Sequence, residues 1–198
     1  DLELPLLGGH QLENAATAVA ALEMISDAQG FHLSPDALKK GFKEVSWPCR
    51  MEVLSSDPLL VADGAHNVYS VDTLLATLPH YFDYKRLLLV TGISHDKNVG
   101  GMVGSLAAKA SRVYATASRH PRSLGADELA RLFVDAGAEA QSVATPAQAL
   151  EQATAAAGPS DLVLATGSLF LAAEIREAAL GIEPEIYPDL SPPRRGAN

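Results

Sequence analysis

Four short polar segments each follow a run of apolar residues, and they hold most of the side chains that could do chemistry. The segments are DGAHN at 63–67, GISHDKN at 92–98, SRHPRS at 118–123 and TGS at 166–168. Between them they supply a carboxylate, imidazoles, cations and hydroxyl groups. Such groups gathered in one place are typical of a site for a charged ligand. The four segments therefore predict a binding or catalytic site.

Two of these segments place a small polar residue directly before a helical pattern. Asn67 and Ser168 stand at such positions, and the unpaired backbone N–H groups of a helix N-terminus attract phosphate or carboxylate oxygens. Asp63, at the end of an apolar run, could accept hydrogen bonds from ribose hydroxyls. An anionic ligand is therefore expected.

Each of these residues also has an ordinary structural interpretation. Asp63, Asn67 or Ser168 could simply cap the helix that follows. Lys97 could be a solvated surface lysine. Taken one at a time, the histidines of these segments are more typical of surface residues than of ligands; they are His66, His95 and His120. Only the gathering of all these groups favours a site.

Apolar runs alternate with segments of helical composition from residue 51 onward. We expect strands at 51–54, 59–62, 86–91, 112–116, 140–143 and 162–165, and helices at 70–78, 99–110, 126–136, 146–156 and 168–179. Fully apolar strands that alternate with helices predict a doubly wound, mostly parallel α/β sheet covered on both faces. Since the carboxyl ends of parallel strands meet at one edge, the four polar segments should lie along that edge.

The first 45 residues have a different pattern. Residues 14–25 are dense in Ala, Val, Leu and Met, which predicts a helix buried against other helices. Ser34 and Pro35 begin a second helix that runs to about residue 44. We therefore expect a helical unit at 1–45 and the α/β domain at 46–188. The last residues, 189–198, have little to bury and predict a disordered tail.

Composition excludes several classes of protein. The net charge of -9, with no cluster of Lys and Arg, argues against a nucleic-acid binder. No apolar stretch approaches the roughly 20 residues of a membrane span, so no membrane partner is expected. A single cysteine, Cys49, fits a reducing compartment, which favours the cytoplasm. The chain begins at Asp1 without an initiator Met, so it is treated as a piece of a longer protein.

Two nucleotide motifs and the common metal patterns do not occur in the sequence. There is no G-x-x-x-x-G-K-[ST] segment to cradle phosphates and no G-x-G-x-x-G after a strand. No His or Cys spacing typical of zinc is present, and no residue is assigned to a metal. Any ATP phosphate site must therefore come mostly from outside this chain.

Five segments, taken in order, resemble the Mur ligase superfamily, specifically its folylpolyglutamate and dihydrofolate synthase branch. They are GGHQLENAATAVAAL at 8–22, WPCRMEV at 47–53, LLVADGAHNVYS at 59–70, HDKN at 95–98 and ATGSLFLAAEIR at 165–176. The resemblance implies a Rossmann-like C-terminal ligase domain, preceded by two helices from the end of a central ATPase domain. It also implies an N-terminal P-loop region that this chain lacks.

The resemblance further implies an enzyme that uses ATP and Mg²⁺, bound mostly by the absent N-terminal domain of the same protein. ATP phosphorylates a substrate carboxylate, and the amine of an incoming L-glutamate attacks the acyl phosphate to form an amide. The second substrate would be a folate or dihydropteroate. This chain alone is expected to be inactive, because the site forms only when the domains close.

By the same likeness, seven side chains have roles in the site. Asn14 would contact adenine, and Arg50 and Asp63 would reach the nucleotide. His66 would lie near the phosphates as the catalytic residue. The incoming glutamate would be held by Asn67, Lys97 and Ser168.

Some residues of these motifs allow other interpretations or depart from the family pattern. Arg50 could instead stack on the indole of Trp47 or pair with Glu52. Cys49 stands where the family usually has Gly, and Val68 where Pro often follows HN. A side chain at position 49 could alter how the domains approach each other.

Two other functions are compatible with the sequence. The chain could be a binding module that recognises a nucleotide or an acidic amino acid without catalysis. It could also be the C-terminal domain of a muramyl-peptide ligase, although HQxxN, WPxR and DGAHN together fit the folate branch better.

Overall fold

The computed structural model describes residues 1–184. The tail expected at 189–198, and the expected end of the second domain at 188, lie outside the described residues. The chain divides into two compact units, the first being Asp1–Arg50 and the second beginning at Met51.

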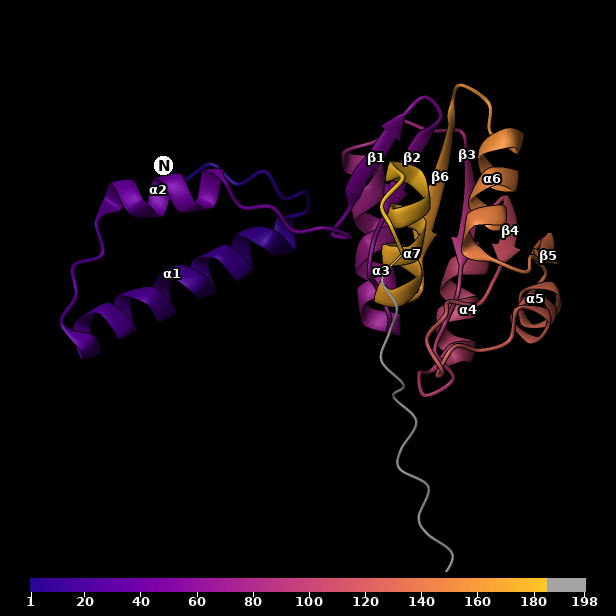
Figure 1. Cartoon of the computed structure of the whole chain (residues 1–198), viewed down its shortest axis with the longest axis horizontal. Helices are drawn as coiled ribbons and strands as arrows, with labels where there is room; N and C mark the ends of the chain where they lie inside the picture. Colours follow the sequence, from indigo (N-terminus) through magenta and orange to yellow (C-terminus); the bar gives the residue numbers. More distant parts are fainter. Residues whose placement is uncertain (185–198) are drawn as a thin grey trace, which may run out of the picture. The chain divides into compact units, whose positions relative to one another are not determined.

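The first unit holds two helices, α1 (Gly9–Gln29) and α2 (Pro35–Lys43) (Figure 1). Helix α2 begins as expected, because the Ser34 hydroxyl accepts a hydrogen bond from the N–H of Ala37 at 3.1 Å. Helix α1 ends at Gly30, whose φ of 70° is the left-handed conformation that favours glycine.

The expectation that the first helix is buried is wrong for the part of the chain that the structure describes. Of the residues of α1, only Gln11 and Ser26 are buried, while Leu12 is 65% and Met24 73% exposed. The reason is that the apolar residues of α1 are distributed around the whole helix, and α2 does not pack closely along it. A helix that is apolar on all sides needs several neighbours to be buried.

The second unit is built on a six-stranded sheet with the order β1-β2-β6-β3-β4-β5. Strands β2, β6, β3, β4 and β5 are parallel, and β1 is antiparallel to β2. The strands are β1 (Glu52–Ser56), β2 (Leu59–Ala62), β3 (Arg86–Thr91), β4 (Arg112–Ala115), β5 (Ala140–Ser142) and β6 (Asp161–Thr166). The predicted doubly wound, mostly parallel sheet is therefore confirmed.

Helices cover both faces of this sheet (Figure 1). Helix α3 contacts α4, and α4 contacts α5, on one face, whereas α6 and α7 contact each other on the opposite face. The helices are α3 (Val68–Thr77), α4 (Val99–Ala107), α5 (Ala126–Asp135), α6 (Pro146–Ala156) and α7 (Leu169–Leu180), with a short 3-10 turn η1 (Leu78–His80) after α3. Across residues 1–184, no helix combines the length and apolar character needed to cross a membrane.

Alternate residues of the strands form the core beneath α6 and α7. Strand side chains such as Leu88, Val90 and Val163 pack with Leu171 and Ile175 of α7, and all are buried. The intervening strand residues point to the other face, which follows from the two-residue period of a strand. Because the sheet is buried on both faces, the strands appear in the sequence as unbroken runs of apolar residues.

Candidate functional site

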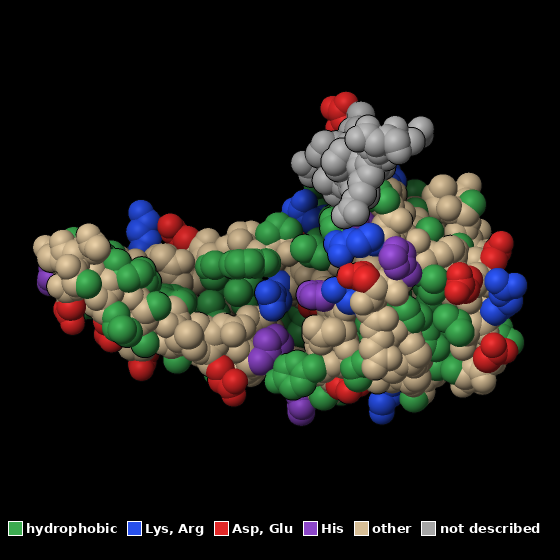
Figure 2. Space-filling view, turned by 90° about the horizontal axis from the view of Figure 1, so that it is seen from below, with side chains coloured by type: hydrophobic (Ala, Val, Ile, Leu, Met, Phe, Trp, Pro, Cys, Tyr) green, Lys and Arg blue, Asp and Glu red, His purple; other side chains and the backbone are tan. Residues whose placement is uncertain are grey.

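The carboxyl ends of β2, β6, β3 and β4 lie side by side, so the four polar segments meet at one edge of the sheet. The segments after β2 and β6 are joined directly. The N–H of Asp63 donates to the carbonyl of Ala165 at 2.9 Å, and the N–H of Gly167 donates to the carbonyl of Ala65 at 3.1 Å. Figure 2 looks onto this edge of the second unit, where basic, acidic and histidine side chains gather. The expected common edge is confirmed.

The segments after β3 and β4 are also joined. The N–H of His95 donates to the carbonyl of Arg122 at 2.9 Å. Asp96 lies between two cations, 3.0 Å from the Arg122 guanidinium and 3.4 Å from the Lys97 ammonium. Although partial desolvation acts in the opposite direction, these cations lower the pKa of Asp96. The Lys97 side chain is 34% exposed, so its ammonium reaches solvent beside an ionised carboxylate.

Asn67 and Ser168 are both helix N-caps. The Asn67 side-chain oxygen accepts from the N–H of Ser70 at 2.8 Å, and the Asn67 N–H donates to the Ser70 hydroxyl at 3.2 Å. The Ser168 hydroxyl accepts from the N–H of Phe170 at 3.2 Å, and Ser168 is buried. The capping interpretation is therefore confirmed for both residues, and both helix N-termini lie at the site edge.

Asp63 does not cap a helix. Its Oδ2 accepts from the N–H of Met51 at 2.9 Å and its Oδ1 from the N–H of Ala65 at 2.8 Å, and the residue is 8% exposed. His66 is exposed, with its ring Nδ1 2.9 Å from the carbonyl of Gly64. The Asp63 carboxylate thus accepts hydrogen bonds from backbone N–H groups of neighbouring segments, whereas His66 is exposed at the same edge.

Two glycines let the segments pack closely. A Cβ at Gly167, where φ is 110°, would lie 2.6 Å from the Thr91 hydroxyl and 3.0 Å from the carbonyl of Gly92. A Cβ at Gly92 would lie 2.9 Å from the carbonyl of Thr116. Because these contacts leave no room for a side chain, the ends of β6, β3 and β4 are held together by backbone.

His120 is buried, so the expectation that it lies at the surface is wrong. It is 5% exposed, stacks on Phe170 with ring centroids 3.9 Å apart, and its Nδ1 accepts from the N–H of Arg122 at 3.1 Å. Burial, and then the nearby Arg122 charge, lower its pKa. The residues around His120 in the sequence do not predict this burial, because Phe170 reaches the histidine only through the tertiary structure.

Glu174 is another buried polar residue, and the sequence alone did not predict its burial. Its Oε1 accepts from the N–H of Arg119 at 2.7 Å, and the residue is 5% exposed. Burial raises the pKa of this carboxyl. A signal was present, because Leu171 and Ile175 place Glu174 on the buried side of α7 at helical spacing.

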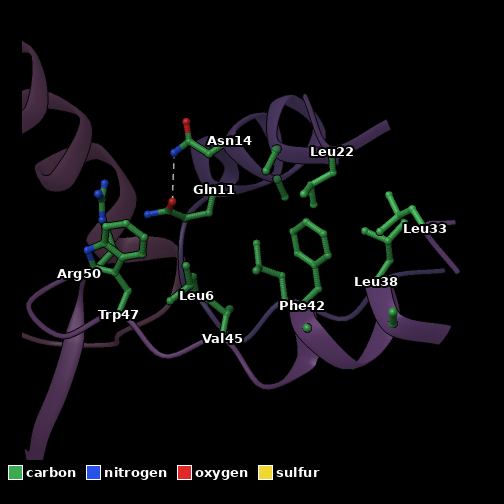
Figure 3. A pocket seen from close by; sticks show the side chains of 15 residues that line it. Leu6, Gln11, Asn14, Leu22, Leu33, Leu38, Phe42, Val45, Trp47 and Arg50 are labelled. Carbon is green, nitrogen blue, oxygen red and sulfur yellow. Dashed lines mark hydrogen bonds between the residues drawn. The ribbon is translucent and has the colours of Figure 1, made fainter. Parts of the chain in front are cut away.

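Asn14 and Arg50 belong to a separate groove within the first unit, with a volume of about 580 Å³ (Figure 3). At one end, the Asn14 amide donates to the Gln11 side-chain oxygen at 3.1 Å, and the Arg50 guanidinium lies 5.6 Å from the centre of the Trp47 ring. The other end is apolar and is lined by residues that include Leu22. The predicted stacking of Arg50 on Trp47 is therefore present.

The sheet edge thus brings together five of the seven predicted site residues, and the groove holds the other two. The five are Asp63, His66, Asn67, Lys97 and Ser168. Within residues 1–184, no group of three or more His, Cys, Asp or Glu side chains is placed to hold a metal ion. The edge offers an ammonium, a guanidinium and two helix N-termini, which suit carboxylate or phosphate oxygens.

A mostly parallel sheet covered by helices on both faces, with basic side chains and two helix N-termini at the carboxyl ends of its strands, defines a domain of the doubly wound α/β class. Residues 49–169 match the sequence profile of the Mur ligase, glutamate ligase domain, and the chain belongs to this family.

Two relatives show which members of this family the chain is similar to. A probable bifunctional folylpolyglutamate synthase/dihydropteroate synthase of Halobacterium salinarum is 41% identical over 175 residues, which cover 88% of this chain and 21% of that protein. A Lacticaseibacillus casei folylpolyglutamate synthase is 32% identical over 185 residues, covering 91% of this chain and 41% of that protein. The chain therefore spans between about a fifth and two fifths of these relatives.

Solved structures agree with this family. A Mycobacterium tuberculosis folylpolyglutamate synthase complexed with ADP and AMPPCP has a TM-score of 0.78 at 30% identity, covering 93% of this chain and 43% of that one. A bifunctional folylpolyglutamate synthase/dihydrofolate synthase with Mn, AMPPNP and L-glutamate bound has a TM-score of 0.76 at 30% identity, covering 91% and 41%. A UDP-N-acetylmuramyl-tripeptide synthetase of Lactobacillus delbrueckii is only 28% identical over 174 residues, covering 83% of this chain and 32% of that protein.

Proposed function

We propose that this chain is the C-terminal, glutamate-binding part of an ATP-dependent amide ligase that adds L-glutamate to a folate. The reaction is that of a folylpolyglutamate synthase, and a dihydropteroate is a second substrate to be tested. The observation that carries the proposal is the cationic sheet edge, where Lys97 lies with the N-termini of α3 and α7, in a chain of the glutamate ligase domain family.

Two steps make up the reaction. A carboxylate oxygen of the folate takes the γ-phosphoryl group of ATP, and ADP leaves. The amine nitrogen of glutamate then attacks the acyl carbon, inorganic phosphate leaves, and the amine loses a proton as the amide forms. Mg²⁺ balances the phosphate charge during transfer. No described residue of this chain is assigned to that ion.

In this proposal the sheet edge binds and orients glutamate. The Lys97 ammonium pairs with a glutamate carboxylate, since a charge-assisted hydrogen bond is stronger than a neutral one. Asn67 and Ser168 fix the starts of α3 and α7, and the N-terminus of a helix suits carboxylate oxygens. Holding the amine in one orientation toward the acyl carbon lowers the entropic cost of attack.

The first-unit groove is the proposed adenine site. The Asn14 amide can both donate to and accept from the edge of an adenine ring. Arg50, stacked on Trp47, presents a guanidinium suited to phosphate oxygens. His66, exposed at the sheet edge, is proposed to lie near the phosphates. Asp63 is proposed to support nucleotide use.

The proposed partner is an N-terminal P-loop region of the same protein, and the first unit is proposed to be the end of its central ATPase domain. Support comes from the exposed apolar side chains of α1, such as Leu12 and Met24, because large exposed apolar surfaces mark contact sites. The coverage of only about a fifth to two fifths of the relatives agrees with this. We also propose a cytoplasmic location, supported by the single cysteine.

A direct experiment separates the proposed reaction from its two alternatives. The whole protein is assayed for ADP release with a folate and L-glutamate, and separately with a UDP-muramyl peptide and its amino acid. The proposal expects ADP release that requires folate and glutamate together. Turnover with the muramyl substrate alone would identify a muramyl-peptide ligase. Nucleotide or glutamate binding without any turnover would identify a binding module.

A further inference from the structure

The segment after β4, residues 118–123, lies against the first two turns of α7, and two contacts hold it there. The His120 ring stacks on Phe170 with ring centroids 3.9 Å apart, and the N–H of Arg119 donates to Glu174 Oε1 at 2.7 Å. Phe170 and Glu174 are four positions apart, so they lie on the same face of α7. The segment is therefore attached to the helix whose N-terminus lies at the proposed glutamate site.

The His120 imidazole also fixes the backbone of this segment. Its Nδ1 accepts a hydrogen bond from the N–H of Arg122 at 3.1 Å. A ring nitrogen accepts a hydrogen bond only while it carries no proton, so this bond requires the neutral imidazole. The residue is 5% exposed, and a protonated ring would have to keep its charge away from water at this position. Only the neutral ring is therefore suited to hold the Arg122 backbone.

Arg122 in turn connects the segment to Lys97. The Arg122 carbonyl accepts from the N–H of His95 at 2.9 Å. The Arg122 guanidinium lies 3.0 Å from Asp96, and the same carboxylate is 3.4 Å from the Lys97 ammonium. Asp96 thus divides its attraction between two cations. If the guanidinium moved away, Asp96 would pair with Lys97 alone and compete with a substrate carboxylate for the ammonium.

The charged and titratable groups near His120 come from its own segment, from the segment after β3 and from α7. They are Arg119 and Arg122, then His95, Asp96 and Lys97, and finally Glu174 and Glu177. Burial, and then the Arg122 charge, lower the pKa of His120, whereas Asp96 acts in the opposite direction. The ring is therefore neutral near pH 7 and takes up a proton only at a pH below its ordinary pKa of about 6.5.

We propose that His120 is a positioning residue for the glutamate site. It holds Arg122 next to Asp96 and so leaves the Lys97 ammonium available to a substrate carboxylate. When His120 takes up a proton, the Arg122 backbone is released and glutamate binds less tightly. This inference rests on the proposed function, in which Lys97 binds glutamate.

Steady-state kinetics of the whole protein test this role. KM for glutamate is measured between about pH 5.5 and about pH 7.5 for the wild type, His120→Phe and His120→Asn. Phe keeps a ring to stack on Phe170 but accepts no hydrogen bond, so KM for glutamate should rise by about three- to tenfold at neutral pH. Asn can still accept and does not titrate, so its KM at neutral pH should lie nearer the wild-type value. KM for ATP should stay within about twofold in both variants.

The dependence on pH distinguishes positioning by His120 from a general structural role. The wild-type KM for glutamate should rise as the pH falls through the pKa that an NMR titration gives for His120, and this rise should be smaller in both variants. His80→Asn, which changes an exposed histidine on η1, should behave as the wild type does. The same acid-dependent rise in the variants as in the wild type would overturn the proposal. So would a rise in KM for ATP as large as that for glutamate.

Amide hydrogen exchange gives a second readout that needs no activity. His120→Phe should speed exchange at the Arg122 amide while the amide of Leu164 in β6 stays protected. Unchanged exchange at Arg122 in His120→Phe would show that the imidazole does not hold this backbone. If His120→Phe also loses protection at Leu164, the decision passes to His120→Asn. Acidification should then speed exchange at Arg122, relative to Leu164, more in the wild type than in His120→Asn, and equal changes would overturn the proposal.

These readouts also separate the inference from the proposed function. If the wild-type protein shows no turnover with folate and glutamate, the proposed function fails, and exchange at Arg122 still decides whether His120 holds the segment. If turnover is present but the His120 variants leave exchange at Arg122 and KM for glutamate unchanged, the inference fails and the proposed function stands.

Discussion

At the scale of single residues, Lys97 is the side chain on which the glutamate assignment depends most. Its ammonium is 3.4 Å from Asp96 and partly exposed, so it can pair with an incoming carboxylate without a large desolvation cost. We expect Lys97→Ala in the whole protein to raise KM for glutamate by about ten- to a hundredfold, since a charge-assisted pair contributes about 1.5–3 kcal/mol. KM for ATP should change little, as measured by steady-state kinetics.

A matched control for this variant is Lys109→Ala, which removes an exposed lysine beyond the end of α4. It should leave both KM values unchanged. Equal losses for ATP and glutamate in Lys97→Ala would contradict the assignment of Lys97 to the glutamate site.

The buried imidazole of His120 gives a prediction about pH. Burial lowers its pKa, so the folded protein keeps the ring neutral where the unfolded chain would be protonated. The stability that this provides is complete above the ordinary histidine pKa of about 6.5 and is lost as the pH falls through the folded pKa. An NMR titration should give a midpoint for His120 below 6.5. A midpoint at or above 6.5 would show that the stacked ring is accessible to protons in the folded state.

At the scale of elements, Asn67 is the N-cap of α3 and also a residue proposed to lie at the glutamate site. Asn67→Ala removes the acceptor for the Ser70 N–H and should lower the free energy of unfolding by about 1 kcal/mol. Asn67→Asp keeps a capping oxygen, so stability in urea should stay near the wild type. Its added negative charge should nevertheless raise KM for glutamate if this helix start faces the substrate carboxylates. An unchanged KM in Asn67→Asp would remove Asn67 from the binding site.

The opposite edge of the sheet is held by an ion pair that has no role in the proposed reaction. At the start of β6, the buried Asp161 carboxylate accepts from Arg86 Nε at 3.0 Å and from the Gly158 N–H at 2.7 Å. Asp161→Ala should lower the free energy of unfolding by about 2 kcal/mol, because these donors lose their hydrogen-bond acceptor. Urea unfolding measures the loss, with exposed Asp135→Ala as the control. A loss of glutamate affinity without a loss of stability would contradict this structural role.

The Asp161 carboxylate also makes the free energy of unfolding depend on pH in the acidic range. The hydrogen bond from Arg86 holds the pKa of Asp161 below its usual range, although burial acts in the opposite direction. Its contribution is therefore present above the ordinary carboxyl pKa of about 4 and is lost as the pH falls below it. In Asp161→Ala, the decline in stability on acidification should be shallower than in the wild type.

Local signals in the sequence were enough to predict these elements, but not the burial of particular polar residues. The strands at 59–62 and 86–91, and the capping residues Asn67 and Ser168, follow from short-range pattern and hydrogen bonding. The burial of His120 depends on Phe170, fifty positions away, so no local pattern marks it. The bond from Met51 to Asp63 likewise appears only once β1 pairs with β2.

At the scale of the whole molecule, the chain has the groups proposed to bind glutamate and the groove proposed for adenine, but its sequence holds no P-loop motif. We therefore expect this 198-residue chain by itself to show no glutamate-dependent ATP hydrolysis, as measured by phosphate release. Adding the proposed N-terminal P-loop region should restore it. Sustained turnover by the isolated chain would show that it carries a complete ATP site.

The central claim is that the protein joins glutamate to a folate, and the most direct test is to identify the product. The whole protein is incubated with ATP, Mg²⁺, a folate and isotopically labelled L-glutamate, and the folate is analysed by mass spectrometry. The account predicts a folate that carries the labelled glutamate through a new amide bond, formed together with ADP and phosphate. Consumption of ATP with the label left entirely in free glutamate would contradict it.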